Sequence, residues 1–304
     1  MKTVRFLFSA ILAVTLVSCS QEDVLQLTDD LPVVYTGYME KATSRVLLDQ
    51  DNMMNWEMDD QLTIFPKYDI NNQYKVVAID NGLATFEYMD YVDKSDYSSI
   101  DDTYAVYPYY EGNKLEGNVI TTFVPTEVSY SSTKESIKYA LMSAKSPSER
   151  LKFTNAQGIL HLRLNAVTPF KHGAIASIKL ESTSKKLSGT VVIDYSGNET
   201  PIAEIVEGEN YLLVNLSEEL QTDLPAEKSN GWAEFYIPVI PASFVANDIK
   251  MTITWKDGET YERSVGIGFE IKRNTIYELK HTIRGVPVYN GGLEGAEEGQ
   301  DGHL

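Results

Sequence analysis

The chain has 304 residues, 43% of them hydrophobic, with a formal net charge of −18 at pH 7 and a single cysteine. This acidic balance argues against nucleic acid as a partner, because binding a polyanion requires clusters of lysine and arginine. One cysteine cannot form an internal disulfide, so the stability of the folded chain must come from packing.

Residues 1–18 have the pattern of a bacterial secretion signal. Lys2 and Arg5 stand at or before the start of an apolar run of thirteen residues, Phe6–Ser18. The run is shorter than the ~20 residues that span a bilayer, so a signal peptide is favoured over a permanent transmembrane helix. Its removal takes away both positive charges and no acid, and the formal charge moves from −18 to −20.

The single cysteine directly follows this run. Leu16-Val17-Ser18-Cys19 resembles the bacterial lipobox, in which the cysteine is acylated and becomes the first residue of the mature protein. Two or three acyl chains would hold the protein at the outer membrane, since each buried methylene contributes about 0.8 kcal/mol. Residues 19–32 begin with the polar, acidic segment Ser20-Gln21-Glu22-Asp23 and are expected to form a tether that leads to the cell surface.

From Val33 to Ile283 the dominant period is two residues, which is typical of β-strands with one buried face. Turn signals such as Asp80-Asn81-Gly82 and Asp257-Gly258 separate the alternating runs. We count roughly fourteen to sixteen strand candidates. The clearest apolar sets are Leu160, Leu162 and Leu164; Leu212, Val214 and Leu216; Phe235, Ile237 and Val239; and Ile249, Met251, Ile253 and Trp255.

These strands predict an all-β protein of two antiparallel β-sandwich domains, because about 250 ordered residues are many for one sandwich. One large barrel is the alternative. The single helix candidate, Lys134–Ala144, precedes a boundary at Ser146-Pro147-Ser148. The expected division is a signal peptide at 1–18, a tether at 19–32, sandwiches at 33–148 and 149–285, and a flexible Gly/Glu-rich tail at 286–304.

Motifs of catalysis are absent from the sequence. It contains no GxSxG elbow, P-loop or HExxH. Gly266-Ile267-Gly268 lacks the third glycine and the helix of a dinucleotide site and is interpreted as a strand irregularity. His161 alternates with leucines, so an exposed or hydrogen-bonded histidine is favoured over a metal ligand. We therefore expect no catalytic residue, no metal and no cofactor.

Two weaker ligand signals remain. Asp49-Gln50-Asp51-Asn52 starts like a calcium loop, but Met53 and Met54 stand where an EF-hand needs an oxygen ligand and a glycine, which leaves an irregular calcium site as an alternative. Four tyrosines cluster around Pro108 and could stack on sugars or on a partner protein. In the alternative interpretation, their rings fill the core. The four are Tyr104, Tyr107, Tyr109 and Tyr110.

A series of landmarks resembles the fimbrillin family, the lipoprotein subunits of type V pili and related surface proteins of Gram-negative anaerobes. Each motif is weak alone, but the order and spacing together are fairly specific and cover almost the whole mature chain. In chain order the landmarks are Thr43-Ser44-Arg45-Val46-Leu47-Leu48 with Trp56, Asp59-Asp60-Gln61-Leu62-Thr63-Ile64-Phe65, Tyr104-Ala105-Val106-Tyr107-Pro108-Tyr109, Leu141-Met142-Ser143-Ala144, Phe153–Leu160, Ile178-Lys179-Leu180 with Leu187-Ser188-Gly189, Phe235–Val239 and Asn274–Leu279.

The resemblance implies two transthyretin-like β-sandwich domains, export as a lipoprotein, and assembly with other fimbrial subunits by strand exchange after a cut between Arg45 and Val46. One departure concerns the donor strand that a stalk subunit should supply. Residues 284–304 contain only Val286, Val288 and Leu293 before Gly and Glu dominate. A tip, an anchor or a non-polymerising relative is therefore also consistent with the sequence.

We therefore expect a lipid-anchored fimbrial subunit or adhesin of the cell outer membrane without catalytic activity. Its expected contacts are other subunits and a host or bacterial surface protein or glycan. The alternative is a monomeric surface lipoprotein that binds glycans through exposed aromatic residues.

Overall fold

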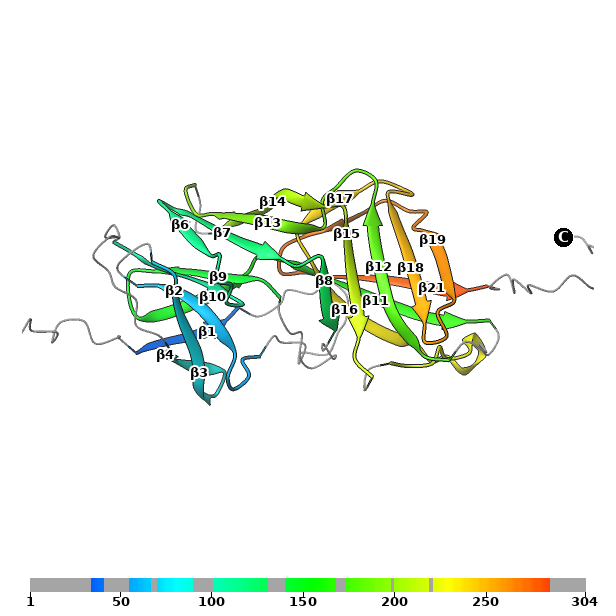
Figure 1. Cartoon of the computed structure of the whole chain (residues 1–304), viewed down its shortest axis with the longest axis horizontal. Helices are drawn as coiled ribbons and strands as arrows, with labels where there is room; N and C mark the ends of the chain where they lie inside the picture. Colours follow the sequence, from blue (N-terminus) through cyan, green and yellow to red (C-terminus); the bar gives the residue numbers. More distant parts are fainter. Residues whose placement is uncertain are drawn as a thin grey trace, which may run out of the picture. The chain divides into compact units, whose positions relative to one another are not determined.

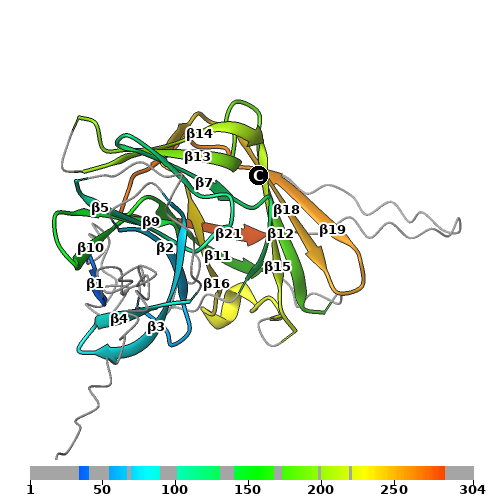
Figure 2. The ribbon, with the colours of Figure 1, turned by 60° about the vertical axis from the view of Figure 1, so that its left-hand side comes forward.

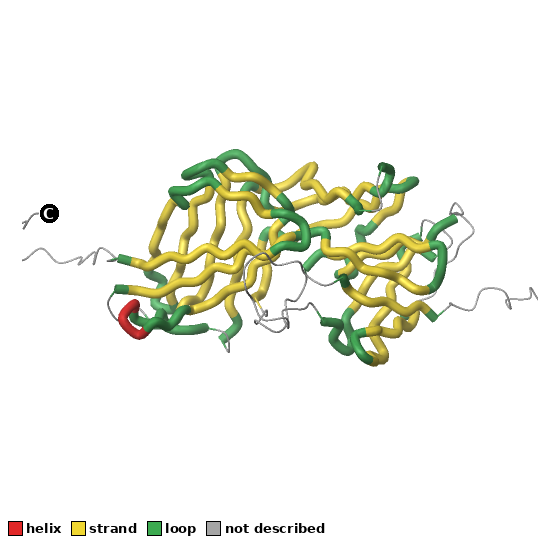
Figure 3. Tube along the Cα trace, turned by 180° about the vertical axis from the view of Figure 1, so that it is seen from behind, coloured by secondary structure: helices red, strands yellow, loops and turns green. Residues whose placement is uncertain are grey.

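The computed structural model describes residues 34–40, 55–66, 70–89, 101–130, 140–167, 173–197, 200–218 and 221–284. These residues are almost entirely strands and turns, so the prediction of an all-β protein is confirmed (Figure 3). Within them the structure has one short 3₁₀ helix, η2 (Glu227–Ser229). The helix expected at Lys134–Ala144 is wrong where it can be checked, because Met142 to Ala144 belong to a strand; residues 134–139 lie outside the described part. No helix in the described ranges is long and apolar enough to cross a membrane.

The first group of strands forms a closed barrel, seen in Figure 2. Tyr35, Trp56, Phe86 and Phe153 are among the rings that fill its core. In order around the barrel, its strands are β1 (Tyr35–Met39), β10 (Arg150–Asn155), β9 (Met142–Ser146), β5 (Thr103–Tyr107), β2 (Gln61–Phe65), β3 (Asn72–Asp80) and β4 (Leu83–Tyr88), which pairs again with β1.

A second group forms a sandwich of a five-stranded and a three-stranded sheet around a large aliphatic core (Figure 1). The five strands are, in order, β19 (Thr260–Ser264), β18 (Ile249–Trp255), β12 (Ile175–Ser182), β15 (Tyr211–Leu216) and β8 (Glu127–Tyr130). The three strands are β16 (Ala233–Val239), β11 (Gly158–Ala166) and β21 (Ile276–Ile283), and a two-stranded ribbon consists of β17 (Ala242–Phe244) and β20 (Phe269–Ile271).

The remaining sheet combines strands from both halves of the sequence. Its order is β14 (Ile202–Glu209), β13 (Ser188–Asp194), β7 (Val119–Val124) and β6 (Lys114–Glu116). A third cluster of buried residues links this sheet to β5, since Val191 and Ile193 share it with Tyr104 and Val106. Pairing thus crosses the expected boundary at 148/149, where the adjacent strands β9 and β10 also pair with each other. The division into two sandwich domains stays a prediction.

The turn signals form the expected hairpins. At the β3–β4 turn Asn81 and Gly82 have φ of 49° and 80°, the left-handed conformation that a two-residue hairpin turn of type I′ requires. The β18–β19 hairpin likewise contains Asp257 and Gly258. The structure has more strands than the fourteen to sixteen expected, because pieces of three or four residues such as β6, β8, β17 and β20 are too short to show a period.

Among the strands that the structure describes, three pairs are parallel, whereas the sequence favoured antiparallel sheets throughout. They are β1 with β10, β11 with β21, and β15 with β8. Each joins strands that lie far apart in the sequence. The period of two is the same in both kinds of pair, so the sequence pattern cannot tell them apart.

The predicted buried face of β18 is confirmed. Ile249, Met251, Ile253 and Trp255 all lie in the sandwich core, and Trp255 is 1% exposed. Trp255→Ala should therefore reduce the free energy of unfolding by about 3–5 kcal/mol, as expected for an aromatic ring removed from a packed core. Chemical denaturation measures it, with Thr254→Ala on the opposite face as the matched control. A loss below about 1 kcal/mol would contradict the burial of this face.

Candidate functional site

Cys19, Arg45 and Val46 lie outside the described part of the chain, and so do residues 49–54 of the possible calcium site. Their roles stay predictions. The segment with Arg45 directly follows the end of β1 in the sequence, which directs attention to that strand.

Two of the four clustered tyrosines belong to the core. Tyr104 and Tyr107 are 3% and 5% exposed, and their hydroxyls donate to Asn118 and Asp60, at 2.5 and 3.1 Å. The core interpretation is therefore correct for these two rings, and the expectation of ligand contact is wrong for them. The reason is that β5 is covered on both faces, by the barrel core and by the sheet that contains β13.

The other two tyrosines are more accessible. Tyr109 is half-buried, while Tyr110 is 45% exposed and stacks on Phe123 with ring centroids 5.6 Å apart. The side chain of Asn71 donates to the carbonyl oxygens of Tyr110 and Glu111, at 3.0 and 2.9 Å, and so holds this loop. Ligand contact by Tyr109 and Tyr110 stays a prediction.

The candidate site is the position that β1 occupies in the barrel. β1 has five residues and lies between two partners, parallel to β10 and antiparallel to β4. Thr36 faces Arg150 on one side and Thr85 on the other. β1 is the strand that connects β4 to β10 and so closes the barrel. Its departure would open the barrel and leave backbone donors and acceptors on β4 and β10 without their partners.

The middle of β1 passes very close to the barrel core. A Cβ atom on Gly37 would lie 2.7 Å from a ring carbon of Phe86 and 2.8 Å from one of Phe153, closer than real Cβ atoms approach. A side chain at this position would have to displace these two buried rings, so the position favours glycine. A glycine inside a strand pattern is a known signal of close backbone approach, so sequence reading had a clue here that it did not use.

Tyr35, two residues earlier, fills the barrel with its side chain. Its ring meets that of Tyr74 edge to face, with centroids 5.6 Å apart, and is 3% exposed. Burial raises the pKa of the Tyr35 hydroxyl, although a hydrogen bond with Thr103 opposes the shift. The ring thus anchors the first part of β1 by apolar contact.

A charged contact holds the other end. The Glu40 carboxylate accepts a hydrogen bond from the backbone N–H of Asn155 at 2.7 Å and pairs with Nη1 of Arg273. The same Arg273 nitrogen donates to the Asn155 carbonyl at 3.1 Å. Arg273 also lines an open cavity of about 650 Å³ with Pro201, Ile202 and other residues. This ion pair links β1 to the turn between β20 and β21, a connection that the sequence did not suggest.

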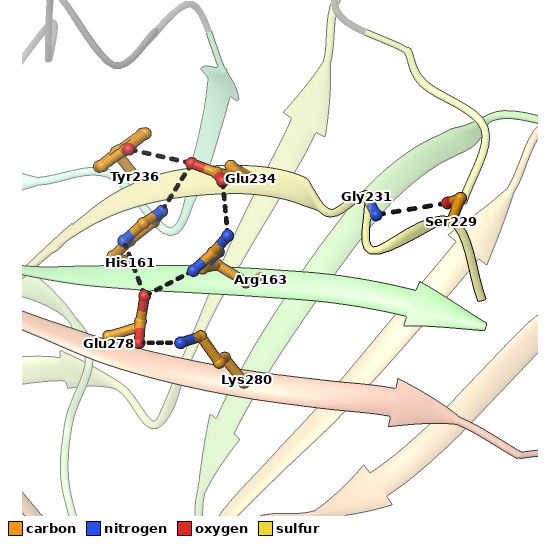
Figure 4. Close-up of polar contacts among 8 residues, drawn as sticks. All are labelled: His161, Arg163, Ser229, Gly231, Glu234, Tyr236, Glu278 and Lys280. Atoms are coloured by element: carbon orange, nitrogen blue, oxygen red, sulfur yellow. Dashed lines mark hydrogen bonds and ion pairs between the residues drawn. The ribbon is translucent and has the colours of Figure 1, made fainter. Parts of the chain in front are cut away.

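A second polar cluster lies on the face of the three-stranded sheet that points away from the sandwich core (Figure 4). Arg163 pairs with Glu234 at 3.1 Å and with Glu278 at 3.0 Å, across the strands on either side. His161 lies beside it, with Nε2 3.1 Å from a Glu234 oxygen and its ring stacked on Tyr236 at 4.3 Å between centroids. The prediction that His161 is a hydrogen-bonded structural residue is confirmed.

Burial dominates the titration of this histidine. It lowers the pKa of His161, although Glu234 and Glu278 favour the protonated form, and Arg163 adds to the lowering. The pKa of Glu278 is lowered as well, but for a different reason: burial would raise it, and the nearby Lys280 and Arg163 outweigh burial. Within the described residues, no group of three His, Cys, Asp or Glu side chains could hold a metal ion. The cluster is a charge ladder that ties three strands together.

Comparison with known proteins gives structural neighbours only. No family model matches the chain, and no curated protein has significant similarity to it. A candidate cell adhesion protein of Bacteroides ovatus is 15% identical, with a TM-score of 0.48, over 83% of this chain and 92% of that one. One of Bacteroides uniformis is 16% identical, with a TM-score of 0.45 and the same coverage.

The tip fimbrial protein Mfa3 of Porphyromonas gingivalis, with a C-terminal truncation, is 9% identical, with a TM-score of 0.27, over 84% of this chain and 96% of that one. The neighbours thus carry the names of adhesion and fimbrial proteins, the class to which the sequence resemblance points. Since these TM-scores are below 0.5, none of them establishes the fold of this chain.

The lowered pKa of His161 predicts a loss of stability in mild acid. Below an unfolded-state pKa of about 6.5, the unfolded chain binds a proton that folded His161 does not, so unfolding becomes more favourable as the pH falls. The melting temperature should therefore differ less between pH 7.5 and pH 5.5 in His161→Gln than in the wild type. His281→Gln should reduce the difference as well, because burial also lowers the pKa of His281. If the melting temperature changes between the two pH values by the same amount in His161→Gln and in the wild type, the pKa of His161 is not lowered by folding.

Proposed function

We propose that this chain is a lipid-anchored surface protein, a fimbrial subunit or fimbrillin-like adhesin, and not an enzyme. Cys19 would carry the acyl chains, and the acidic tether would lead from the outer membrane to the folded part. The motif series in the sequence supports this assignment. Two transthyretin-like domains, divided near residue 148, belong to the same proposal.

The observation that carries the assembly mechanism is the place of β1. It closes the barrel, and the predicted cut between Arg45 and Val46 lies six residues after its last residue, Met39. After that cut, β1 and the lipidated end would be connected to the rest of the chain only by non-covalent contacts. Its departure would present β4 and β10 as two unpaired edges, which a strand from another subunit can fill by β-augmentation.

Two subunits joined in this way would be held by backbone hydrogen bonds and by apolar packing. The incoming strand would restore main-chain hydrogen bonds on both sides and would fill the apolar space that Tyr35 occupies. The hydrogen bonds and the apolar packing would act together, so two subunits could separate only if the strand left the barrel over its whole length. A contact with a host or bacterial protein or glycan through Tyr109 and Tyr110 is a further part of the proposal.

The cut is tested by N-terminal sequencing of protein sheared from cells. Chains that start at Val46 are expected. Arg45→Lys, which keeps the charge but removes an arginine-specific site, should leave only chains that start at acylated Cys19. Wild-type material made up only of chains that start at Cys19 would contradict processing at Arg45.

The anchor is tested separately. Cys19→Ala should block acylation and leave the protein uncleaved or released, whereas Ser20→Ala should remain anchored. Detergent phase separation of cell extracts measures the difference. If the Cys19 variant is still processed and stays in the detergent phase, Cys19 is not the anchor.

A further inference from the structure

The four-stranded sheet of β14, β13, β7 and β6 has one face that is open to solvent. On its other face, Ile120, Val191 and Ile193 are buried against the barrel strand β5. The open face, called here the outer face, lies along the top of the ribbon in Figure 1. Apolar and threonine side chains cover its two central strands and are only half-buried. They are Val119, Thr121 and Phe123 of β7, and Thr190 and Val192 of β13.

The strand registers order the side chains of the outer face into rows that run across the sheet. In the central row, Lys114 of β6 lies beside Thr121, Thr121 lies beside Val192, and Val192 lies beside Glu204 of β14. Lys114 is the only basic residue in the four strands. The central row therefore begins with a cation on one outer strand and ends with a carboxylate on the other.

These two charges lack a counterion within their own chain. Four neighbouring strands place Lys114 and Glu204 about 14 Å apart, too far for an ion pair. Both side chains are exposed, and neither forms an ion pair with another described residue. An apolar centre between two opposite, unpaired charges is a surface that can complement itself.

We propose that the outer face binds the outer face of a second copy of this chain. The two-fold axis runs parallel to β7 and β13 and between them, so β6 of each copy lies over β14 of the other. Lys114 then pairs with Glu204 of the second copy, and Glu204 with Lys114 of the second copy. Thr121 packs against Val192 of the second copy, as in an aligned β-sandwich whose sheets are about 10 Å apart. Because β1 is not part of this sheet, the contact is separate from the proposed function.

The charges select this axis and this partner. A two-fold axis along the central row would instead place Lys114 opposite Lys114 and Glu204 opposite Glu204, and like charges in contact are costly. The other acids of the face, Glu116, Asp194 and Glu207, belong to the flanking rows, where their carboxylates can stay in water at the border. A basic partner protein is the other occupant that acidic residues would suit, and it would leave this chain monomeric.

The size of the outer face predicts a weak dimer. Four strands and three rows of side chains cover roughly 20 Å by 20 Å, or about 400 Å² in each copy. A standard protein interface buries about 800 Å² on each side, so the dimer should form only at high concentration. Its association should therefore depend on the local density of the chain.

Contact between the outer faces is tested by cross-linking the full-length chain, purified in excess mild detergent. Val192→Cys should give dimers with a short bismaleimide, in a yield that rises between about 5 and 200 µM chain. Thr254→Cys is the matched control for random encounter and for any reaction of Cys19, because Thr254 lies on the outward side of β18 in the sandwich. Equal dimer yields in the two variants would overturn the proposal.

The axis is tested by exchanging the two charges in the Val192→Cys chain. Lys114→Glu alone and Glu204→Lys alone should each lower the dimer yield at least about three-fold, because each places like charges opposite each other. The double variant should restore the yield, since both ion pairs form again with their signs exchanged. Thermal midpoints equal to that of the parent chain confirm that the variants fold. Single variants without effect, or a double variant that does not recover, would refute the two-fold arrangement.

Discussion

Closure of the barrel by β1 is the contact on which the rest of this architecture depends. Three of its residues pair with β4 and four with β10, and Gly37 lets the backbone approach Phe86 and Phe153. Trp56 packs against the same two phenylalanines, with centroids 5.2 and 5.0 Å away. The short strand therefore acts as the closing piece of an aromatic core, and the function inferred for the protein depends on its removal.

The parallel pairing of β1 has consequences for how it can be replaced. A parallel neighbour cannot be supplied by a short hairpin, so β1 and β10 meet only through tertiary folding. The same holds for β11 with β21 and for β15 with β8. A strand held by distant partners, and not by a turn, can be exchanged for one from another chain without breaking a local hairpin.

Several features were readable from the sequence because they are local. The alternation of Ile249, Met251, Ile253 and Trp255 predicts the buried face of β18, and Asn81-Gly82 predicts a hairpin through its backbone conformation. Other features were not readable. Strand period does not distinguish parallel from antiparallel pairs. It also did not show that β5 is covered on both faces, so it left open whether Tyr104 and Tyr107 fill the core or contact a ligand. The helix expected up to Ala144 failed for a related reason, because pairing with β5 and β10 overrides local preference there.

The sequence by itself determined the all-β class, the strand faces and most turns, since these depend on neighbours two residues apart or on a single residue's φ. Only the tertiary structure decided that Gly37 faces two phenylalanine rings and that Glu40 meets Arg273, 233 positions away. Such contacts depend on which distant strands become neighbours, and that is settled by packing of the whole core.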